Sequence, residues 1–360
     1  MRRRASSSEE AGLTVLESFR EIRAETNPYI AQLAKALTAT PGVNWDSFSW
    51  PRALFGHVDV YHVHWPEITM GGHNGVGRFA RRTLTAAFYL RLLLTRTPVV
   101  RTWHNTERPS DLGKVDHWLL DVLDGLTTLR IRLNPATPMP LDAPHVTILH
   151  GHYREWYAPY ARSPQIPGRV SYVGLVRRYK GVEDLIQAFS ALPGDVSLLI
   201  AGKPSTQDQA DRVTRMASAD ARIQLRLAFL DDEEFVQSIT GAQLLVLPYR
   251  HMHNSGAVLA ALSLARPVLV PDNEVNRQLA DEVGHAWVHR YQEDLGEADI
   301  ASALRRTAAD QAGQEPDLSA REWEATGSQH LAGFVRAVEI RGDQRVFRRR
   351  RALPGRHPVS

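Results

Sequence analysis

The sequence of 360 residues contains no cysteine. A disulfide framework, a thiolate metal site and a cysteine nucleophile are therefore excluded. Lysine is scarce as well, because arginine supplies nearly all of the basic side chains. The chain keeps four lysines, Lys35, Lys114, Lys180 and Lys203. Each of them is of interest, because most positions that tolerate arginine carry it.

Long apolar runs are also absent. No stretch reaches the roughly 18 uncharged apolar residues that a membrane-spanning helix requires. The N-terminus carries arginines but lacks the apolar core of a signal peptide, so we expect a cytoplasmic protein. In the segment 79–94, arginines flank leucines and aromatic residues. We interpret it first as a buried helix; the alternative is an interfacial helix that contacts the inner face of the membrane peripherally.

The charge is nearly balanced, with a formal net charge of +3. Part of the basic excess lies in two terminal runs, 2–4 and 348–351. Such runs are typical of solvated tails, and the alternative is contact with anionic lipid headgroups. Because neither run is interleaved with aromatic residues, the sequence does not indicate a nucleic-acid partner.

Short apolar strands alternate with helices, most clearly in the second half of the chain. There the expected strands are 170–176, 196–201, 223–230, 244–247 and 267–270. The first half repeats this rhythm less clearly, with expected strands at 13–19, 58–63, 99–103 and 146–149. This alternation predicts an α/β protein with two parallel, doubly wound sheets.

The length and the pattern together predict two Rossmann-like domains. We expect an N-terminal domain at 11–156 and a proline-containing linker at 157–168. A C-terminal domain then spans 169–318, followed by a helix at 319–340. The basic tail at 341–360 is expected to be disordered.

The turns that follow the strands are where ligands should bind, because parallel sheets place their sites beyond the carboxyl ends of the strands. In the second half these turns carry glycines, basic residues and a Ser-Gly helix start. A diphosphate needs such groups, because main-chain N–H groups at a helix start and nearby cations offset its charge. The candidates are Gly174, Arg177, Arg178, Lys180, Gly202, Lys203, Tyr249, Asn254, Ser255 and Gly256.

The same turns carry a family resemblance. The segments YVGLVRRYKGVEDLIQAF, LLIAGKP and LLVLPYRHMHNSGAVLAALSLARPVLVP together resemble the nucleotide-sugar-binding half of GT-B glycosyltransferases, in order and in spacing. The resemblance implies two Rossmann-like domains that face each other across a cleft, with a nucleotide-diphosphate sugar as the donor substrate and no further cofactor.

The resemblance also implies roles for the candidate residues. Arg177 or Arg178, together with Lys180, would hold the pyrophosphate. Gly202 and Lys203 would lie beside the nucleotide. The phosphates and the donor sugar would be bordered by Tyr249 and by the helix start Asn254, Ser255 and Gly256.

The sequence departs from the family pattern at one place. Many retaining GT-B enzymes carry two glutamates eight residues apart, and here Met252 and Ala260 occupy these positions. The departure favours an inverting enzyme. The segments DVYHVHWPE, VVRTWHN and HVTILHGHYREWY are similar to those of mannosyltransferases that act on lipid-linked glycans, so GDP-mannose is the preferred donor and a glycan or lipid-linked acceptor is expected.

An inverting transferase needs a group that takes the proton of the acceptor hydroxyl. The polar residues at the strand exits of the first half are His64, Glu67, His104, Glu107, His150 and His152. We expect Glu67 or His104 to be catalytic, with Trp65 as a platform for a sugar. No metal is expected, because the loops contain no DxD motif and His150, His251 and His253 lack metal-ligand spacing.

Two other functions remain open from the residues. One is a non-catalytic protein that binds a nucleotide-sugar or another phospho-ligand on the same fold, and it would not need the histidines and glutamates of the first half. The other is a sugar-nucleotide epimerase of the GT-B type, which would act on the donor without an acceptor.

Overall fold

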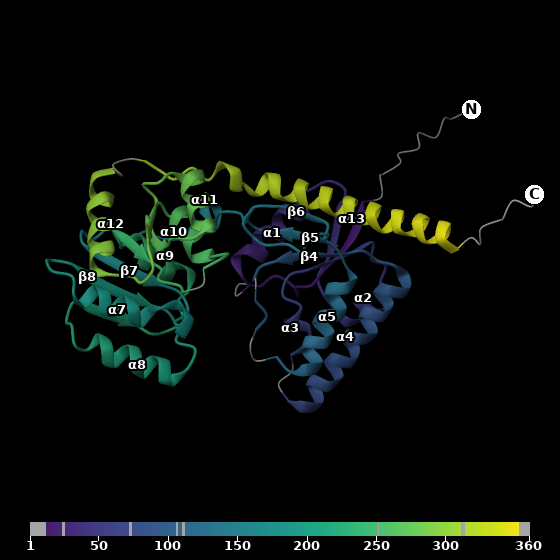
Figure 1. The fold of residues 1–360 in the computed structure, drawn as a ribbon, viewed down its shortest axis with the longest axis horizontal. Helices are drawn as coiled ribbons and strands as arrows, with labels where there is room; N and C mark the ends of the chain where they lie inside the picture. Colours follow the sequence, from purple (N-terminus) through teal and green to yellow (C-terminus); the bar gives the residue numbers. More distant parts are fainter. Residues whose placement is uncertain are drawn as a thin grey trace, which may run out of the picture. The chain divides into compact units, whose positions relative to one another are not determined.

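The computed structural model describes residues 12–23, 26–71, 74–105, 107–109, 112–250, 252–310 and 314–352, without the side chains of 308–310 and 343–352. The chain forms two compact units (Figure 1). Unit 1 comprises residues 1–150 and 323–360, and unit 2 comprises residues 151–322. Each unit is built on one sheet of parallel strands, as the alternation of strands and helices predicts.

The sheet of unit 1 has the strand order β2-β1-β3-β4-β5-β6. Its strands are β1 (Leu13–Glu17), β2 (Val43–Asp46), β3 (Val60–Val63), β4 (Val99–Trp103), β5 (Thr127–Arg132) and β6 (His145–Thr147). The order changes direction at β1, because β2 pairs with one edge of β1 and β3 with the other. Ligands of open parallel sheets bind at such a switch point, beyond the carboxyl ends of the two strands.

Helices cover both faces of this sheet. They are α1 (Pro28–Thr38), α2 (Trp50–Phe55), α3 (Glu67–Met70), α4 (Gly75–Thr95), α5 (Lys114–Leu126) and α13 (Trp323–Ala352). One apolar core joins α1 and α13 to the sheet through residues such as Leu33 and Phe334. A second core, with Phe88 and Leu120, lies under α2, α4 and α5.

Helix α13 returns from the end of unit 2 to unit 1. It packs against α1 and against β3, β4 and β5, and in Figure 1 it runs along the unit 1 sheet. A short 3-10 helix, η2 (Ser319–Arg321), precedes it. Residues 341–352, which the sequence analysis places in a tail, are helical, and 2–4 and 353–360 lie outside the described residues.

The sheet of unit 2 has the strand order β12-β11-β10-β7-β8-β9. Its strands are β7 (Arg169–Val173), β8 (Ser197–Ala201), β9 (Ile223–Arg226), β10 (Leu244–Val246), β11 (Val268–Pro271) and β12 (Val288–Tyr291). The order changes direction between β7 and β10. Gly174 and Leu247 follow these two strands, so the turns after them meet at the switch point of this sheet.

The helices of unit 2 alternate with these strands. They are α6 (Arg154–Tyr157), η1 (Arg178–Lys180), α7 (Val182–Ser190), α8 (Gln207–Ala217), α9 (Asp232–Thr240), α10 (Gly256–Ser263), α11 (Glu274–Val283) and α12 (Glu297–Asp310). Helix α10 is apolar on nearly all sides and six of its eight residues are buried, as expected of a helix inside a core.

The start of unit 2 precedes the proline-containing segment 157–168. Tyr153 and Tyr157 are buried in the core of unit 2. Trp156 Nε1 and Tyr160 OH each donate a hydrogen bond to Asp232, both at 3.0 Å. The structure therefore places the boundary between the units at His150 and Gly151, upstream of the linker expected from the sequence.

Candidate active site

The carboxyl ends of β3 and β4 open into a cavity of about 160 Å³ in unit 1. Its lining includes Trp65 and Glu67, which follow β3, and His104 and Asn105, which follow β4. The two residues predicted to be catalytic, Glu67 and His104, therefore share one cavity. It has this composition because neighbouring parallel strands deliver the residues after them to the same edge of the sheet.

The imidazole of His104 is held between aromatic rings. It stacks on Trp65, with ring centroids 4.0 Å apart and planes inclined by 22°. Tyr29 contacts it edge-on at 5.2 Å. Burial, followed by the nearby His64, holds the pKa of His104 well below its usual range. The ring is therefore neutral near pH 7, which is the state that can accept a proton.

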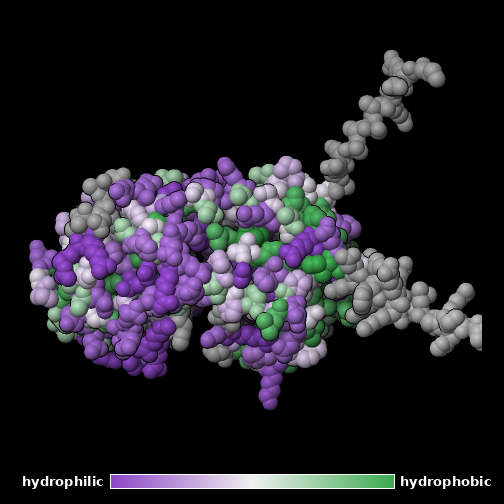
Figure 2. Space-filling view, turned by 45° about the horizontal axis from the view of Figure 1, so that its top comes forward, coloured by the Kyte–Doolittle hydropathy of each residue, from purple (hydrophilic) through white to green (hydrophobic). Residues whose placement is uncertain are grey.

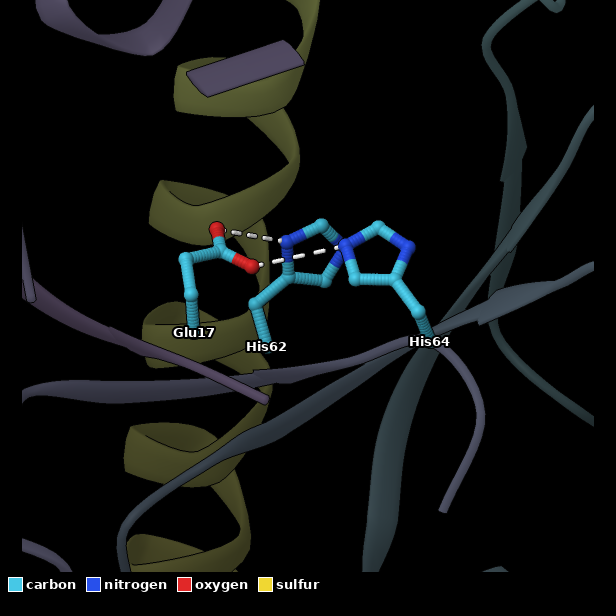
Figure 3. Close-up of side chains that lie close together, drawn as sticks. All are labelled: Glu17, His62 and His64. Atoms are coloured by element: carbon cyan, nitrogen blue, oxygen red, sulfur yellow. Dashed lines mark hydrogen bonds and ion pairs between the residues drawn. The ribbon is translucent and has the colours of Figure 1, made fainter. Parts of the chain in front are cut away.

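A network of buried polar contacts connects His104 to the switch point of the sheet. Nε2 of His104 lies 3.0 Å from Nδ1 of His64. Nε2 of His64 lies 3.4 Å from Oε2 of Glu17, which is an ion-pair contact, because neither atom has a hydrogen-bond partner among the described residues. Nδ1 of His62 lies 2.9 Å from Oε1 of the same carboxylate, at hydrogen-bond distance (Figure 3). The other nitrogen of His62, Nε2, is 2.8 Å from Oγ1 of Thr102.

Burial dominates the protonation of this network. It lowers the pKa of His62 to about 3 and the pKa of His64 to about 4, so both rings are neutral near pH 7. It raises the pKa of Glu17, against which hydrogen bonding and charge from His64 act. Glu17, His62 and His64 also offer metal-ligand atoms within 4.8 Å of one another. Of these three residues, Glu17 and His62 are joined by a hydrogen bond, and Glu17 and His64 by an ion-pair contact.

Glu17 and His62 are not among the residues predicted from the sequence. Two signals could have found them. Glu17 is a charged residue at the end of an apolar strand, and it is fully buried. His62 and His64 are two residues apart, so their side chains leave the strand on the same face.

Glu67 lies on a different part of the cavity lining. It is the first residue of α3, and its charge acts on the guanidinium of Arg101. Arg101 also pairs with Asp124 and lies over the ring of Trp103, 4.3 Å from its centroid. This wall therefore combines carboxylates with a buried cation, whereas the wall at His104 consists of neutral rings.

The other candidate bases from the first half lie as follows. Glu107 lines the same cavity. His150 packs on Tyr29, with ring centroids 4.7 Å apart. His152 belongs to unit 2, where its Nε2 lies 2.9 Å from a carboxylate oxygen of Glu322.

In unit 2, two of the predicted glycines follow the neighbouring strands β7 and β8. Gly174 follows β7 with φ +135°, and Gly202 follows β8 with φ +148°. Both values favour glycine. A Cβ at Gly202 would lie 1.9 Å from the carbonyl oxygen of Gly174, so the two turns can approach this closely only without a side chain there.

Lys180 connects the turn after β7 to the turn after β10. Its Nζ donates a hydrogen bond to the hydroxyl of Tyr249 at 3.2 Å and lies 4.6 Å from the centroid of that ring. Burial, and then the charge of Arg177, lowers the pKa of Lys180 to about 8. A bound anion would stabilise the charged form of this partly desolvated cation.

Ser255 and Gly256 complete this group at the start of α10. Ser255 is the N-cap and accepts a hydrogen bond from the N–H of Val258 at 3.4 Å. Burial raises the pKa of the Tyr249 phenol, and the side chain of Ser255 is close enough to act against this increase. Gly256 lies close to Tyr153, whose hydroxyl would be 3.3 Å from a Cβ at Gly256. The structure thus brings Gly174, Lys180, Tyr249 and Ser255 together.

The remaining predicted residues lie as follows. Arg177 is exposed but close enough to act on Lys180. Arg178 begins η1 with an exposed side chain. Lys203 is exposed, and its carbonyl accepts the N–H of Val176 at 3.0 Å. Asn254 is half-buried and precedes the N-cap of α10.

Met252 and Ala260 are both buried, so neither position offers a polar group to a ligand. Asn273 donates a hydrogen bond from Nδ2 to the carbonyl of Met252 at 2.9 Å. Asn276 Nδ2 contacts the sulfur of Met252 at 3.4 Å. His251 lies outside the described residues.

A family model and a curated protein both match this chain. Residues 167–310 match the family model described as glycosyl transferases group 1. The GDP-mannose:glycolipid 4-beta-D-mannosyltransferase of Xanthomonas campestris pv. campestris is 40% identical over 332 residues, which cover 92% of this chain and 94% of that protein.

Solved structures extend the comparison to the fold. HepE of Anabaena, in complex with UDP and glucose, is 14% identical with a TM-score of 0.56, over 95% of this chain and 100% of that one. The catalytic domain of starch synthase IV from Arabidopsis thaliana, bound to ADP and acarbose, is 9% identical with a TM-score of 0.59, over 91% and 99%. The predicted pair of Rossmann-like domains is confirmed as the fold.

Proposed function

Because this chain belongs to the glycosyltransferases of the GT-B fold, we propose that it transfers mannose from GDP-mannose to a glycolipid, without a metal and with inversion at the anomeric carbon. The observation that carries the proposal is the 40% identity to the Xanthomonas mannosyltransferase over 92% of the chain. The match covers 92% of the chain, so it extends over both units.

We assign the donor diphosphate to the group around Lys180 in unit 2. The ammonium of Lys180, the guanidinium of Arg177 and the main-chain N–H groups at the start of α10 supply the positive potential that a diphosphate requires. These groups would also stabilise the negative charge that GDP gains as it leaves. They provide the role that a metal ion has in other transferases.

The stereochemistry follows from the chemistry of the relative's substrate and product. GDP-mannose carries its sugar in the α configuration, and the Xanthomonas relative is named for a β-linked product. A single displacement that converts α into β needs one base on the acceptor side. We assign this base to unit 1, where His104 and Glu67 line the same cavity.

We assign the base to His104, because its low pKa leaves the ring neutral at the pH of the cytoplasm. Trp65, stacked on His104, offers an aromatic face for the acceptor sugar. Glu67 is the second candidate, because its carboxylate lines the same cavity. The two assignments are separated by substitution of each residue in turn.

A glycolipid acceptor requires contact with a membrane surface, and α4 has a suitable face. Its buried face carries Phe88, Tyr89 and Leu92. The opposite, exposed face carries neutral residues at spacings of three or four, which we name the α4 stripe: Val76, Phe79, Ala80, Thr83, Ala87, Leu90 and Leu94. Such a line of exposed apolar side chains is typical of a helix that lies in a membrane interface.

Other exposed apolar residues lie on the helices that pack around α4, namely Phe55 on α2, Ile68 on α3 and Trp118 on α5. Hydrophobic surface is visible on unit 1 in Figure 2. Arg78 and Arg96 are exposed near the two ends of α4 and would attract anionic headgroups. In the described residues, no helix is both long and apolar enough to span a membrane.

The proposal is tested by incubation of the protein with GDP-mannose and long-chain alkyl glycosides. Formation of a mannosylated glycoside with a β linkage supports it. Binding of GDP-mannose without transfer or hydrolysis would favour the non-catalytic alternative, and isomerisation of the free donor would favour the epimerase. The comparisons lend neither alternative support, because the curated relative is a transferase.

A further inference from the structure

The network of polar contacts behind His104 begins at Glu17, the last residue of β1. Glu17 pairs in register with His62 at the point where the sheet changes direction. From there the contacts run through His64 to His104 at the cavity. We propose that Glu17 is a positioning residue that fixes the tautomer of His104 through His64 and stabilises the charge that His104 gains in the reaction. This inference rests on the proposed function, in which His104 is the base.

The tautomers follow from which atoms can donate. The proposal requires Glu17 to be ionised, so its pKa, which burial raises, must still lie below the working pH. An ionised Glu17 only accepts hydrogen bonds, so each ring that faces it must present an N–H. His64 therefore carries its proton on Nε2, toward Glu17, and its Nδ1 has the lone pair. His104 must then donate from Nε2 to that lone pair. As a result, Nδ1 is the basic nitrogen of the neutral His104 ring.

The other arm of the network does not disturb this assignment. His62 donates from Nδ1 to Glu17 and accepts at Nε2 from the hydroxyl of Thr102. A hydroxyl can donate or accept, so Thr102 suits either tautomer of His62. The carboxylate is thus the group that decides the direction of the hydrogen bonds in both arms.

The charge of the reaction is balanced as follows. The acceptor oxygen attacks the anomeric carbon while the bond from that carbon to the phosphate oxygen breaks, and GDP leaves with the electron pair. The acceptor proton moves to Nδ1 of His104. The imidazolium that forms donates its Nε2 proton in a hydrogen bond to His64, whose own N–H points to Glu17. The carboxylate therefore offsets the new positive charge across one intervening ring.

The negative charge of Glu17 has a strong effect on the network because of the groups that surround it. The groups that act on His64 and His104 from the packed elements are His62 on β3, Arg101 on β4, His150 after β6 and His330 on α13. Each of these four side chains is neutral or cationic. Glu17, which also acts on His64, is a carboxylate. Because its side chain is fully buried, its field is weakly screened by water.

A structural role alone does not account for Glu17. A buried carboxylate costs stability unless it is fully paired, and an apolar side chain at the end of β1 would avoid that cost. A metal site is the competing explanation, because Glu17, His62 and His64 have suitable atoms for one. The two explanations differ in where the ring protons lie and in the metal content of the protein.

Glu17→Gln tests the charge with little change in shape. Its carbonyl can accept from His64 and its amide can donate to His62, because Thr102 can accept from the other tautomer of that ring. We expect kcat for mannosyl transfer from GDP-mannose to alkyl glycosides to fall by about tenfold or more. The acid limb of kcat/KM should move to lower pH, because the imidazolium of His104 loses its carboxylate. The Kd for GDP should stay unchanged.

Asp116→Asn is the matched control. Asp116 is a buried carboxylate of unit 1 whose partner is Arg82, at 2.6 Å. Loss of that ion pair should lower the Tm and leave the pH profile in place. A purely structural Glu17 would behave in the same way. Folded Glu17→Gln with the kcat and acid limb of the wild type would overturn the proposal.

Nitrogen-15 NMR of the histidine-labelled wild type decides the matter if Glu17→Gln does not fold. Protons on Nε2 of both His64 and His104 support the proposal, and a proton on Nδ1 of His64 overturns it. A stoichiometric metal ion bound by these rings in the purified protein also overturns it. The proposed function fails separately, by absence of mannosyl transfer in the wild type; if transfer is present, only the role of Glu17 falls.

Discussion

The ammonium of Lys180 donates a hydrogen bond to the hydroxyl of Tyr249 over 3.2 Å, and so ties the turn after β7 to the turn after β10. These two turns meet at the switch point of the unit 2 sheet. In unit 1, Glu17 and His62 pair in register at the corresponding position. Each sheet thus concentrates its polar, buried groups where its strand order changes direction.

Loss of Lys180 should weaken donor binding. For Lys180→Ala we expect Kd for GDP-mannose to rise by about 10- to 100-fold, the equivalent of one charge-assisted hydrogen bond. Isothermal calorimetry measures the change. Lys114→Ala is the control, because Lys114 is an exposed lysine at the start of α5 in unit 1. Equal affinity of both variants would remove Lys180 from the donor site.

Donor affinity should depend on pH. The pKa of Lys180 is lowered to about 8, so its ammonium is present below pH 8 and is lost as the pH rises above it. The Kd for GDP-mannose should therefore increase between about pH 7.5 and pH 9. Lys180→Arg should flatten this dependence, because arginine stays charged throughout. A wild-type Kd that stays constant to pH 9 contradicts the assignment.

Removal of the proposed base should affect catalysis and spare donor binding. His104→Ala is expected to lower kcat by about 10²- to 10⁴-fold, which is the usual contribution of a general base. The Kd for GDP should not change. His57→Ala is the matched control, because His57 is an exposed histidine of the same unit. If Glu67→Gln abolishes transfer and His104→Ala does not, Glu67 is the base.

The glycine pair Gly174 and Gly202 should be intolerant of side chains. Gly202→Ala would place its Cβ against the carbonyl of Gly174, at a φ of +148°. We expect a loss of more than about 2 kcal/mol in the free energy of unfolding. Gly125→Ala provides the contrast, because Gly125 lies in α5 with open space around it. That change should raise stability by about 0.5–1 kcal/mol, and denaturant unfolding compares the two variants.

Membrane contact through the α4 stripe can be tested with two phenylalanines of equal exposure. Phe79 in the stripe is 73% exposed, and Phe229 in unit 2 is 72% exposed. In flotation with phosphatidylglycerol vesicles, Phe79→Glu should lose binding and Phe229→Glu should retain it. Equal binding by both variants would exclude the stripe as the membrane surface.

Much of the fold could be predicted from the sequence, because continuous apolar runs identify buried parallel strands. Strands β2, β5 and β12 escaped prediction, and each of them contains polar residues. Strand β5 contains Arg130 and Arg132, and the guanidinium of Arg130 hydrogen-bonds the carbonyl of Asp124, so the polar tip finds a partner while the stem is buried. Strand β2 is a short edge strand that contains Asn44 and Asp46.

The candidate site could be predicted only in part. The glycines, Lys180 and the start of α10 stand in short local motifs, so their positions could be read from spacing. The network of Glu17, His64 and His104 joins three different strand exits. Contacts between distant segments depend on strand order, which the sequence pattern does not specify. The packing of α13 against unit 1 could not be predicted for the same reason.

The configuration of the product tests the central claim most directly. GDP-mannose labelled with carbon-13 at the anomeric position is incubated with the enzyme and long-chain alkyl glycosides, and the one-bond carbon–hydrogen coupling of the product is measured by NMR. The account predicts a β-mannoside. An α-mannoside, or a protein that binds the donor and neither transfers nor hydrolyses it, would contradict it.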